Sequence, residues 1–486
     1  MAVETREWRQ GVEVVDKYIG RCSLLHNSLK IQQTDQRLRQ KHTRAMSHQK
    51  IAAYNFFKGH PSTALLPADE ILKASQRILT AFNNSLAHYD GRENTHPLNY
   101  GPDLGNLEVR RLISQWNDRL FKLEKPTDPD CINLTNGASF GLMNALLQCT
   151  TPLHNITKRV FMVSPTYFLI NSVFIDNGFG GKLSAIEEFQ DGQIDLKRLE
   201  HELAKIELET PSKTPITQED IPEIYDPNKP MKKVFNYVFY VVPTFSNPRG
   251  GTLSYETKMK LIEIARKYNM LIICDDVYDL LDFNVFRKGG DYHKRMVYID
   301  RETLPEGEVY GNVISNATFS KLLGPGLRSG WQETSTPALA SCLASGGANM
   351  SGGTPGHLNT VIIGELLKSG EADKIIKHLN STYSERAEAL KKAVLKYLPE
   401  GTTISPVDGG YFSWITLPDE YDSKAISSEC SKEGVILATG DNFEVTGDNL
   451  GWGKHAVRVS ISHLECDEIE QGIQIWGEIC QRSLKK

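Results

Sequence analysis

A short loop in the second half of the chain carries the residues with the clearest chemical potential. The stretch TFSKLLGPGLRSGW, residues 318–331, holds Lys321 between hydroxyl side chains and an arginine. A lysine amine that attacks a carbonyl carbon forms a Schiff base. An arginine and hydroxyl groups held close together suit a phosphate group. The loop with Thr318, Ser320 and Arg328 therefore predicts covalent amine chemistry beside an anion site.

Other polar side chains follow apolar runs that look like buried strands. Asp275 and Tyr278 come directly after one run. Asn247 follows a second run, and Tyr167 follows a third. Because ligands of a parallel α/β sheet sit beyond the carboxyl ends of its strands, we expect these side chains to share one pocket with Lys321.

The segment NLTNGASFGLMNALLQ, residues 133–148, reads as a turn that leads into a helix. Free backbone N–H groups at Ala138 and Ser139 could bind an anion there. Taken singly, each of these residues has a common structural role in a turn, a helix cap or a salt bridge. Taken together, they supply an amine for an aldehyde, a carboxylate for a pyridinium nitrogen and a phosphate cradle, which is the equipment for pyridoxal 5'-phosphate (PLP).

The elements that must position these residues follow an alternating pattern. Short apolar runs rich in Val, Ile, Phe and Tyr predict buried strands at residues 159–163, 234–242, 270–274 and 311–319. Residues 256–269 between them place Leu261, Ile262 and Ala265 on one helical face. Strands that alternate with helices predict an α/β fold, a mostly parallel sheet with helices on both faces.

The C-terminal part changes character. Residues 455–462 alternate strictly, with Val457 and Val459 on one side and Arg458 on the other, which predicts a smaller α+β domain. The expected domains are an N-terminal extension, a large cofactor-binding domain and a small domain built from two segments. Their ranges are 1–48, 106–344, and 49–105 with 345–486, respectively. Insertions are expected near residues 207–232, at the surface, and near residues 284–308.

Composition excludes several classes of protein. The chain has 486 residues and a net charge of -5, with 55 Lys and Arg against 60 Asp and Glu, so no nucleic-acid partner is expected. No apolar run reaches the length of about 20 residues that a membrane span needs. The 8 cysteines are scattered without a C-x-x-C pair, which indicates reduced thiols. With no leader pattern at the start, we expect a cytoplasmic protein without a metal site.

With these residues in place, the sequence resembles the class I PLP-dependent aminotransferases of fold type I. The resemblance covers roughly residues 51–480 and is most specific at SKLLGPGLRSGW, DDVY and SNPRGG. Further matching pieces are NFFKGHPSTALLP, LNYGPDLGNLEVRRLI, DGGYFSW and VRVSIS. The subgroup that it most resembles contains 2-aminoadipate, kynurenine and aromatic aminotransferases.

The resemblance implies a role for each matching residue. Lys321 would bind the cofactor aldehyde and later move a proton, and Asp275 would pair with the pyridine nitrogen. Asn247 and Tyr278 would hydrogen-bond the phenolic oxygen of the ring, and Tyr167 would stack on the ring. Lys321, Asp275 and Tyr278 are thus the expected catalytic residues.

The resemblance also assigns the phosphate and the substrate. The phosphate would be held by Ala138, Ser139, Thr318, Ser320 and Arg328. Arg458 would bind the α-carboxylate of the substrate beside Asn247, and Gly59 would let the N-terminal segment approach the substrate closely. Tyr100 would reach the cofactor phosphate of a partner subunit, so a homodimer with shared active sites is part of the expectation.

The implied activity is transfer of an amino group from an L-amino acid to a 2-oxo acid. The subgroup favours 2-aminoadipate or an aromatic donor with 2-oxoglutarate as acceptor, in ping-pong kinetics. The alternatives are a PLP-dependent lyase or decarboxylase on the same fold, and a non-catalytic regulator that binds PLP or an amino acid. Three departures from the family pattern are present. The GASF segment at the phosphate turn keeps its backbone donors, while Arg249 and Thr439 bear on substrate preference more than on cofactor binding.

Overall fold

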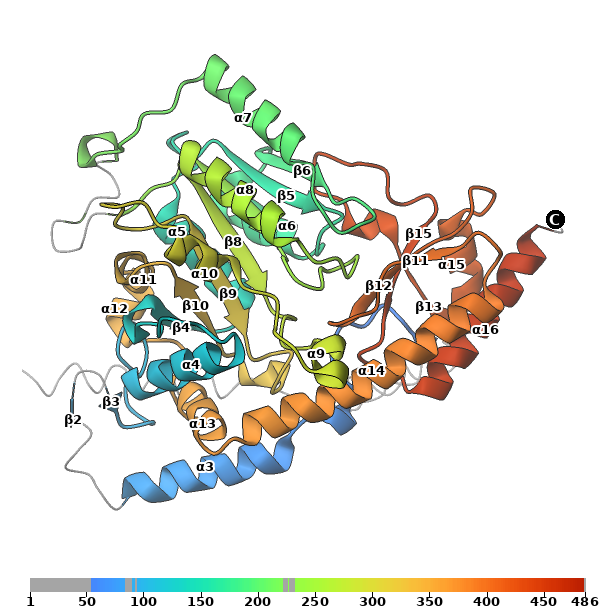
Figure 1. The fold of residues 1–486 in the computed structure, drawn as a ribbon, viewed down its shortest axis with the longest axis horizontal. Helices are drawn as coiled ribbons and strands as arrows, with labels where there is room; N and C mark the ends of the chain where they lie inside the picture. Colours follow the sequence, from blue (N-terminus) through green and yellow to red (C-terminus); the bar gives the residue numbers. More distant parts are fainter. Residues whose placement is uncertain (1–53, 84–89, 92–93, 222–225, 227–231, 485–486) are drawn as a thin grey trace, which may run out of the picture. The chain divides into compact units, whose positions relative to one another are not determined.

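A seven-stranded sheet of mixed, mainly parallel strands dominates the part of the chain that the structure describes (Figure 1). The computed structural model describes residues 54–83, 90–91, 94–221, 226 and 232–484. The sheet has the order β4-β10-β9-β8-β7-β5-β6, and only β10 runs against its neighbours. Its strands are β4 (Ile132–Thr135), β5 (Arg159–Ser164), β6 (Leu183–Glu187), β7 (Tyr237–Val241), β8 (Met270–Asp276), β9 (Val313–Thr318) and β10 (Gly330–Thr334).

The central strands are buried along their whole length. Every residue of β7, β8, β9 and β10 is buried, which requires cover on both faces of the sheet. The four runs that the sequence predicts as strands coincide with β5, β7, β8 and β9, so the predicted α/β fold is confirmed. The sequence did not reveal the reversal at β10. Gly330 pairs with Thr318, so β9 and β10 form a hairpin whose loop carries Lys321.

Helices fill the connections between the strands. The predicted helix over residues 256–269 is α8 (Tyr255–Lys267), and the Ser254 hydroxyl caps it by accepting from the backbone N–H of Thr257 at 3.1 Å. The others of this region are α4 (Leu107–Leu120), α5 (Ala138–Cys149), α6 (Ile170–Phe174), α7 (Leu196–Glu209), α9 (Phe283–Lys288), α10 (Met296–Glu302) and α11 (Pro337–Ala344).

A second, antiparallel sheet lies in the C-terminal part, as the alternation at residues 455–462 predicts. It has the order β11-β12-β15-β14, and a two-stranded parallel pair joins β1 to β13. These strands are β1 (Tyr54–Asn55), β11 (Thr403–Ile404), β12 (Phe412–Thr416), β13 (Val435–Ile436), β14 (Ala438–Thr439) and β15 (Ala456–Ser460). The sheet is accompanied by α15 (Ser423–Lys432) and α16 (Cys466–Ser483).

The 27-residue helix α14 (Glu371–Tyr397) runs beside both the large sheet region and the small antiparallel sheet region (Figure 1). It contacts both α9 and α16. Helix α13 (His357–Lys368) contacts α14 and also α3 (Ala68–Asn83). The short helix α12 (Gly347–Gly352) precedes α13, and β2 (Asp90–Gly91) and β3 (Asn94–Thr95) form a small hairpin. The boundaries expected for a large and a small domain stay predictions.

The expected insertions have different structures. Residues 207–232 begin inside α7 and continue through a single helical turn at Gln218–Asp220, with residues 222–225 and 227–231 outside the described residues. Residues 284–308 contain the end of α9 and all of α10, whose first five residues are buried. The N-terminal extension, residues 1–48, also lies outside the described residues. Within the described ranges, no helix combines the length and apolar character that crossing a membrane requires.

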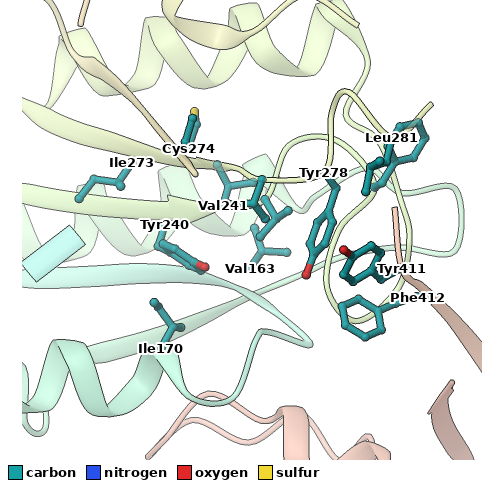
Figure 2. Packing of buried hydrophobic residues seen from close by; sticks show 14 of the residues in the cluster. Val163, Ile170, Tyr240, Val241, Ile273, Cys274, Tyr278, Leu281, Tyr411 and Phe412 are labelled. Atoms are coloured by element: carbon teal, nitrogen blue, oxygen red, sulfur yellow. The ribbon is translucent and has the colours of Figure 1, made fainter. Parts of the chain in front are cut away.

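Figure 2 shows how aromatic side chains fill the space beyond the ends of β7 and β8. The ring of Tyr278 lies 5.3 Å from that of Tyr411 and 5.8 Å from that of Phe412. Phe412 is the first residue of β12 and Tyr411 directly precedes it, so this contact joins the large sheet to the small one. Packing of this kind fixes the edge of the large sheet against the small one.

One glycine allows a close approach of two backbone segments. Gly353 follows α12 with φ +70°, and a Cβ atom placed there would lie 1.8 Å from the carbonyl oxygen of Gly101. Both the backbone conformation and the contact therefore require glycine. Gly289, at the end of α9, has a similar φ of +73° but open space around it.

Substitution of these two glycines can distinguish the cost of backbone strain from the cost of steric overlap. We predict that Gly289→Ala lowers the free energy of unfolding by about 1–3 kcal/mol, because a φ of 73° combined with a ψ of -176° is a backbone conformation that essentially only glycine adopts. Gly353→Ala adds a backbone collision, so we expect a loss larger by about 1–3 kcal/mol. Urea unfolding of both variants measures the difference. Equal losses would mean that the segment around Gly101 moves away freely.

Candidate active site

The carboxyl ends of β5, β7, β8 and β9 open into one cavity of about 420 Å³. Such a volume is typical of a site for a small molecule. Every site residue predicted from the sequence except Tyr100 lines this cavity. They are Gly59, Ala138, Ser139, Tyr167, Asn247, Asp275, Tyr278, Thr318, Ser320, Lys321, Arg328 and Arg458.

Lys321 lies in the loop between β9 and β10 and points into the cavity. Its Nζ donates to the carbonyl oxygen of Gly59 at 3.3 Å. Burial lowers the pKa of Lys321 to about 8, although the charge of Asp275 acts in the opposite direction. An amine with such a pKa exists partly as the free base near neutral pH, which is the form that attacks a carbonyl carbon.

Asp275 is the penultimate residue of β8, where the strand enters the cavity. Burial raises the pKa of its carboxyl group to about 6, while a hydrogen bond from Tyr240 and the charge of Lys321 limit the rise. The Tyr240 hydroxyl donates to Oδ2 at 2.7 Å. Among the described residues, nothing hydrogen-bonds the buried Oδ1. A buried, unpartnered carboxylate oxygen beside a cavity favours a ligand that presents a cationic N–H group.

The start of α5 and the lysine loop form an anion site together. Gly137 begins the helix with φ +89°, and a Cβ atom there would lie 3.0 Å from Nη2 of Arg328. The Arg328 guanidinium therefore lies close to the first turn of α5, where it donates to the carbonyl oxygen of Asn136 at 3.2 Å. The Thr318 hydroxyl donates to Ser320 Oγ at 2.9 Å. Helix N–H groups, a guanidinium and two hydroxyls fit a phosphate.

Arg458 projects from β15 into the opposite part of the cavity and is only 2% exposed. It donates from Nη1 to Asn247 Oδ1 at 3.1 Å and from Nη2 to the carbonyl oxygen of Phe57 at 2.6 Å. Burial lowers its pKa to about 10. No described carboxylate forms an ion pair with it, and its Nε has no hydrogen-bond partner among the described residues. Such an arginine favours a ligand carboxylate.

Three aromatic rings surround the Arg458 guanidinium. Its centre lies 4.1 Å from the ring of Phe412, 4.7 Å from that of Phe443 and 5.6 Å from that of Phe57. Contact with aromatic faces stabilises a buried cation and also holds the planar group in place. Arg458 is thus oriented before any ligand binds.

Two tyrosines complete the wall of the cavity. Tyr278 is buried and its hydroxyl is hydrogen-bonded by Asn247, while burial raises the pKa of this hydroxyl well above its usual value. Tyr167 lies between β5 and α6, and burial together with the charge of Asp275 raises its pKa. Both hydroxyls therefore stay protonated at neutral pH and can donate to a ligand.

Tyr100 is the predicted site residue that the cavity does not contain. Its side chain is 74% exposed, so it contacts no cofactor site in its own chain. Its expected role at the site of a partner subunit stays a prediction.

Sequence reasoning missed the residues that act on the predicted ones. Tyr240 on the buried strand β7 was not singled out from the sequence, yet its hydroxyl donates to Asp275. Phe57, Phe412 and Phe443, whose rings surround Arg458, were not singled out either. The feature of the sequence that could have revealed these neighbours is Arg458 itself. Because it is flanked by apolar residues on a strand, its charge needs side chains around it that stabilise a buried cation.

Two of the departures from the family pattern, Arg249 and Thr439, lie outside the cavity lining. Arg249 donates from Nη1 to the carbonyl oxygen of Glu188 at 2.9 Å and lies over the ring of Trp452 at 5.5 Å. Thr439 donates from Oγ1 to Asp441 Oδ1 at 2.6 Å. Both side chains therefore bind residues near the site but do not line the cavity.

Residues 55–475 match the family described as aminotransferase class I and II, and the chain belongs to this family. It is thus a PLP-dependent aminotransferase by class, and the resemblance inferred from the motifs is confirmed. An uncharacterized protein of Saccharomyces cerevisiae is 48% identical to it over 89% of this chain and 98% of the yeast protein. The aromatic-amino-acid aminotransferase 1 of Thermococcus litoralis is 25% identical, over 80% of this chain and 81% of that enzyme.

The fold is shared with solved structures of the same class. The kynurenine aminotransferase of Pyrococcus horikoshii, solved in complex with PMP, superposes with a TM-score of 0.68. It is 23% identical, and the match covers 92% of this chain and 95% of that one.

The residues of the cavity fit PLP on their own chemistry. The buried Oδ1 of Asp275 lacks a partner, the start of α5 with Arg328 forms a cradle for a phosphate, and Lys321 supplies an amine in the same cavity.

The lowered pKa of Lys321 is directly testable in cofactor-free protein. Because the free amine is the reactive form, labelling of Lys321 by a small amine reagent should rise with pH through a midpoint near 8. An ordinary lysine reaches half-labelling near pH 10.4. Peptide mass spectrometry measures both, with the exposed Lys391 as internal control. A midpoint for Lys321 that matches Lys391 would contradict the effect of burial.

Proposed function

We propose that this enzyme moves the amino group of an L-amino acid, with 2-aminoadipate or an aromatic amino acid favoured, to a 2-oxo acid, with 2-oxoglutarate favoured as acceptor. The observation that carries the proposal is the pair of cationic groups in one cavity. Lys321 supplies the amine, and the caged Arg458, without an acidic partner among the described residues, suits the α-carboxylate that every such substrate has. The two substrates use the same site in turn, so ping-pong kinetics follow.

The proposed roles divide the cavity into a cofactor end and a substrate end. Ala138, Ser139, Thr318, Ser320 and Arg328 would hold the phosphate of PLP. Asp275 would hold the ring nitrogen through Oδ1, while Tyr240 keeps the other oxygen occupied. Asn247 and Tyr278 would hold the phenolic oxygen, and Tyr167 would cover the ring face.

When bound, PLP supplies an aldehyde for amine exchange and a ring that takes up the electron pair of a broken Cα–H bond. Arg458 binds the α-carboxylate through both nitrogens of its fork and so fixes the direction of the Cα–H bond. Lys321 accepts the proton from Cα, a task suited to an amine with a pKa near the working pH. Asn247 contacts both Arg458 and Tyr278, so it ties the substrate end to the cofactor end.

A homodimer with shared active sites and a cytoplasmic location complete the proposal. The exposed Tyr100 supports the dimer, since Leu98 beside it is also exposed and apolar side chains of this kind favour an interface. Tyr100 would then complete the phosphate site of the partner subunit.

The central test is transfer of the amino group itself. We predict that the holoenzyme converts 2-oxoglutarate to glutamate in a one-to-one ratio with consumption of an amino donor, and that Lys321→Ala makes this activity undetectable because no amine remains to move the proton. The exposed Lys391→Ala serves as the matched control and should keep full activity. Product formation without glutamate would instead indicate a lyase or decarboxylase, and full activity of Lys321→Ala would refute the role of this lysine.

Arg458 gives an independent prediction about substrate binding. Arg458→Lys keeps the charge but loses the planar fork, so we expect KM for the amino donor to rise about tenfold or more. Steady-state kinetics measure this, with Arg287→Lys, which alters an exposed ion pair with Glu388, as control. An unchanged KM would place the carboxylate site elsewhere in the cavity.

A further inference from the structure

The charges that line the cavity are unequal in number. The charged side chains with a role in the proposed function are Asp275, Lys321, Arg328 and Arg458. Lys58 and His60 also line the cavity, and neither has been given a role. Among the described residues, Asp275 is the only carboxylate in the lining, so a cation is left over once the cofactor and the α-carboxylate have been bound.

Lys58 is held in place by a histidine rather than by an acid. Its Nζ lies 3.3 Å from Nε2 of His463, and the ring of His60 meets that of His463 edge-on at 5.3 Å. Burial, followed by the charge of Lys58, lowers the pKa of His463, so this ring is neutral at neutral pH and accepts from the ammonium group. Among the described residues, no carboxylate lies within ion-pair distance of Lys58.

The backbone on either side of Lys58 is fixed to the catalytic groups. The carbonyl oxygen of Phe57 accepts from Arg458 at 2.6 Å, and that of Gly59 accepts from Lys321 at 3.3 Å. The Lys58 N–H donates to Asn55 Oδ1 at 3.2 Å. Lys58 thus belongs to a segment that crosses the substrate end of the cavity, one residue away from the Arg458 contact.

Lys58 and Arg458 share the cavity with apolar side chains. Phe57, Phe168 and Phe412 line the same cavity, and Phe57 meets Phe168 at a ring distance of 5.8 Å. A cavity that combines two cationic side chains with apolar ones suits a molecule with a carboxylate at each end of a short methylene chain.

We propose that Lys58, seated on His463, binds the second carboxylate of the substrate and makes this enzyme selective for dicarboxylic amino acids and oxo acids. The inference rests on the proposed function and narrows it. It favours 2-oxoglutarate as acceptor and an acidic donor such as 2-aminoadipate over an aromatic one. A lysine ammonium with three donors can keep one hydrogen bond to His463 and still offer two to a carboxylate.

Direct binding to the PLP-loaded enzyme tests the site without turnover. Glutarate carries two carboxylates, and pentanoate is the matched chain with one. We expect calorimetry to show that the wild-type enzyme prefers glutarate, and that Lys58→Met lowers this preference about 10- to 100-fold, the value of a charge-assisted hydrogen bond. Lys58→Arg keeps the charge and should keep the preference. A preference that survives in Lys58→Met would overturn the proposal.

Kinetics with paired acceptors give a second, independent measurement. The ratio of kcat/KM for 2-oxoglutarate to kcat/KM for 2-oxohexanoate should fall about 10- to 100-fold in Lys58→Met. An equal loss for both acceptors, or a wild-type enzyme that prefers aromatic donors over acidic ones, would refute the dicarboxylate site while amino transfer still stands. Absence of transfer to either acceptor in the wild type would refute the proposed function, and the calorimetric preference would still report on Lys58.

Discussion

The structure depends on keeping opposite charges out of water at one edge of a sheet. Asp275 and Lys321 both lose solvent at the ends of neighbouring strands, and each makes the burial of the other less unfavourable. Burial brings their pKa values to about 6 and about 8, so both groups titrate close to neutrality. A buried charge is tolerated only where geometry is tightly controlled. The parallel strands, the β9–β10 hairpin and the aromatic packing supply that control.

At the proposed substrate end, the cost of burying a charge is lowered in a different way. Arg458 has no acidic partner among the described residues, and its charge is stabilised by three aromatic rings, an amide oxygen and a backbone carbonyl. These neighbours hold the guanidinium without neutralising it, so its attraction for a ligand anion is kept. Asn247 belongs to both halves of the cavity, because it contacts Arg458 and Tyr278 together.

Much of this arrangement can be inferred from the sequence because it depends on local patterns. Buried parallel strands are continuous apolar runs, and polar residues at their ends stand out, so Asp275, Asn247 and Lys321 are recognisable. Contacts between distant segments leave no such pattern. The pairing of Tyr54 with Val435, the hydrogen bond from Tyr240 to Asp275 and the rings around Arg458 all arise only when the chain folds back on itself. The alternation at β15 does not report exposure either, since all five residues are buried and the side chain of Arg458 lines the cavity.

The distance along the chain between the parts of the cavity has a consequence for biosynthesis. Phe57 and Arg458 touch although 401 residues separate them, and Asn133 on β4 bonds Gln332 on β10 across 199 residues. A ribosome adds about 5–20 residues per second, so the earliest wall of the cavity waits tens of seconds for the last one. During that interval the cavity is incomplete, although the residues proposed to hold the cofactor, from Ala138 to Arg328, have already been synthesised before it ends. Premature stop codons before β15 would leave a protein without Arg458 and therefore with an incomplete cavity, however complete its large sheet.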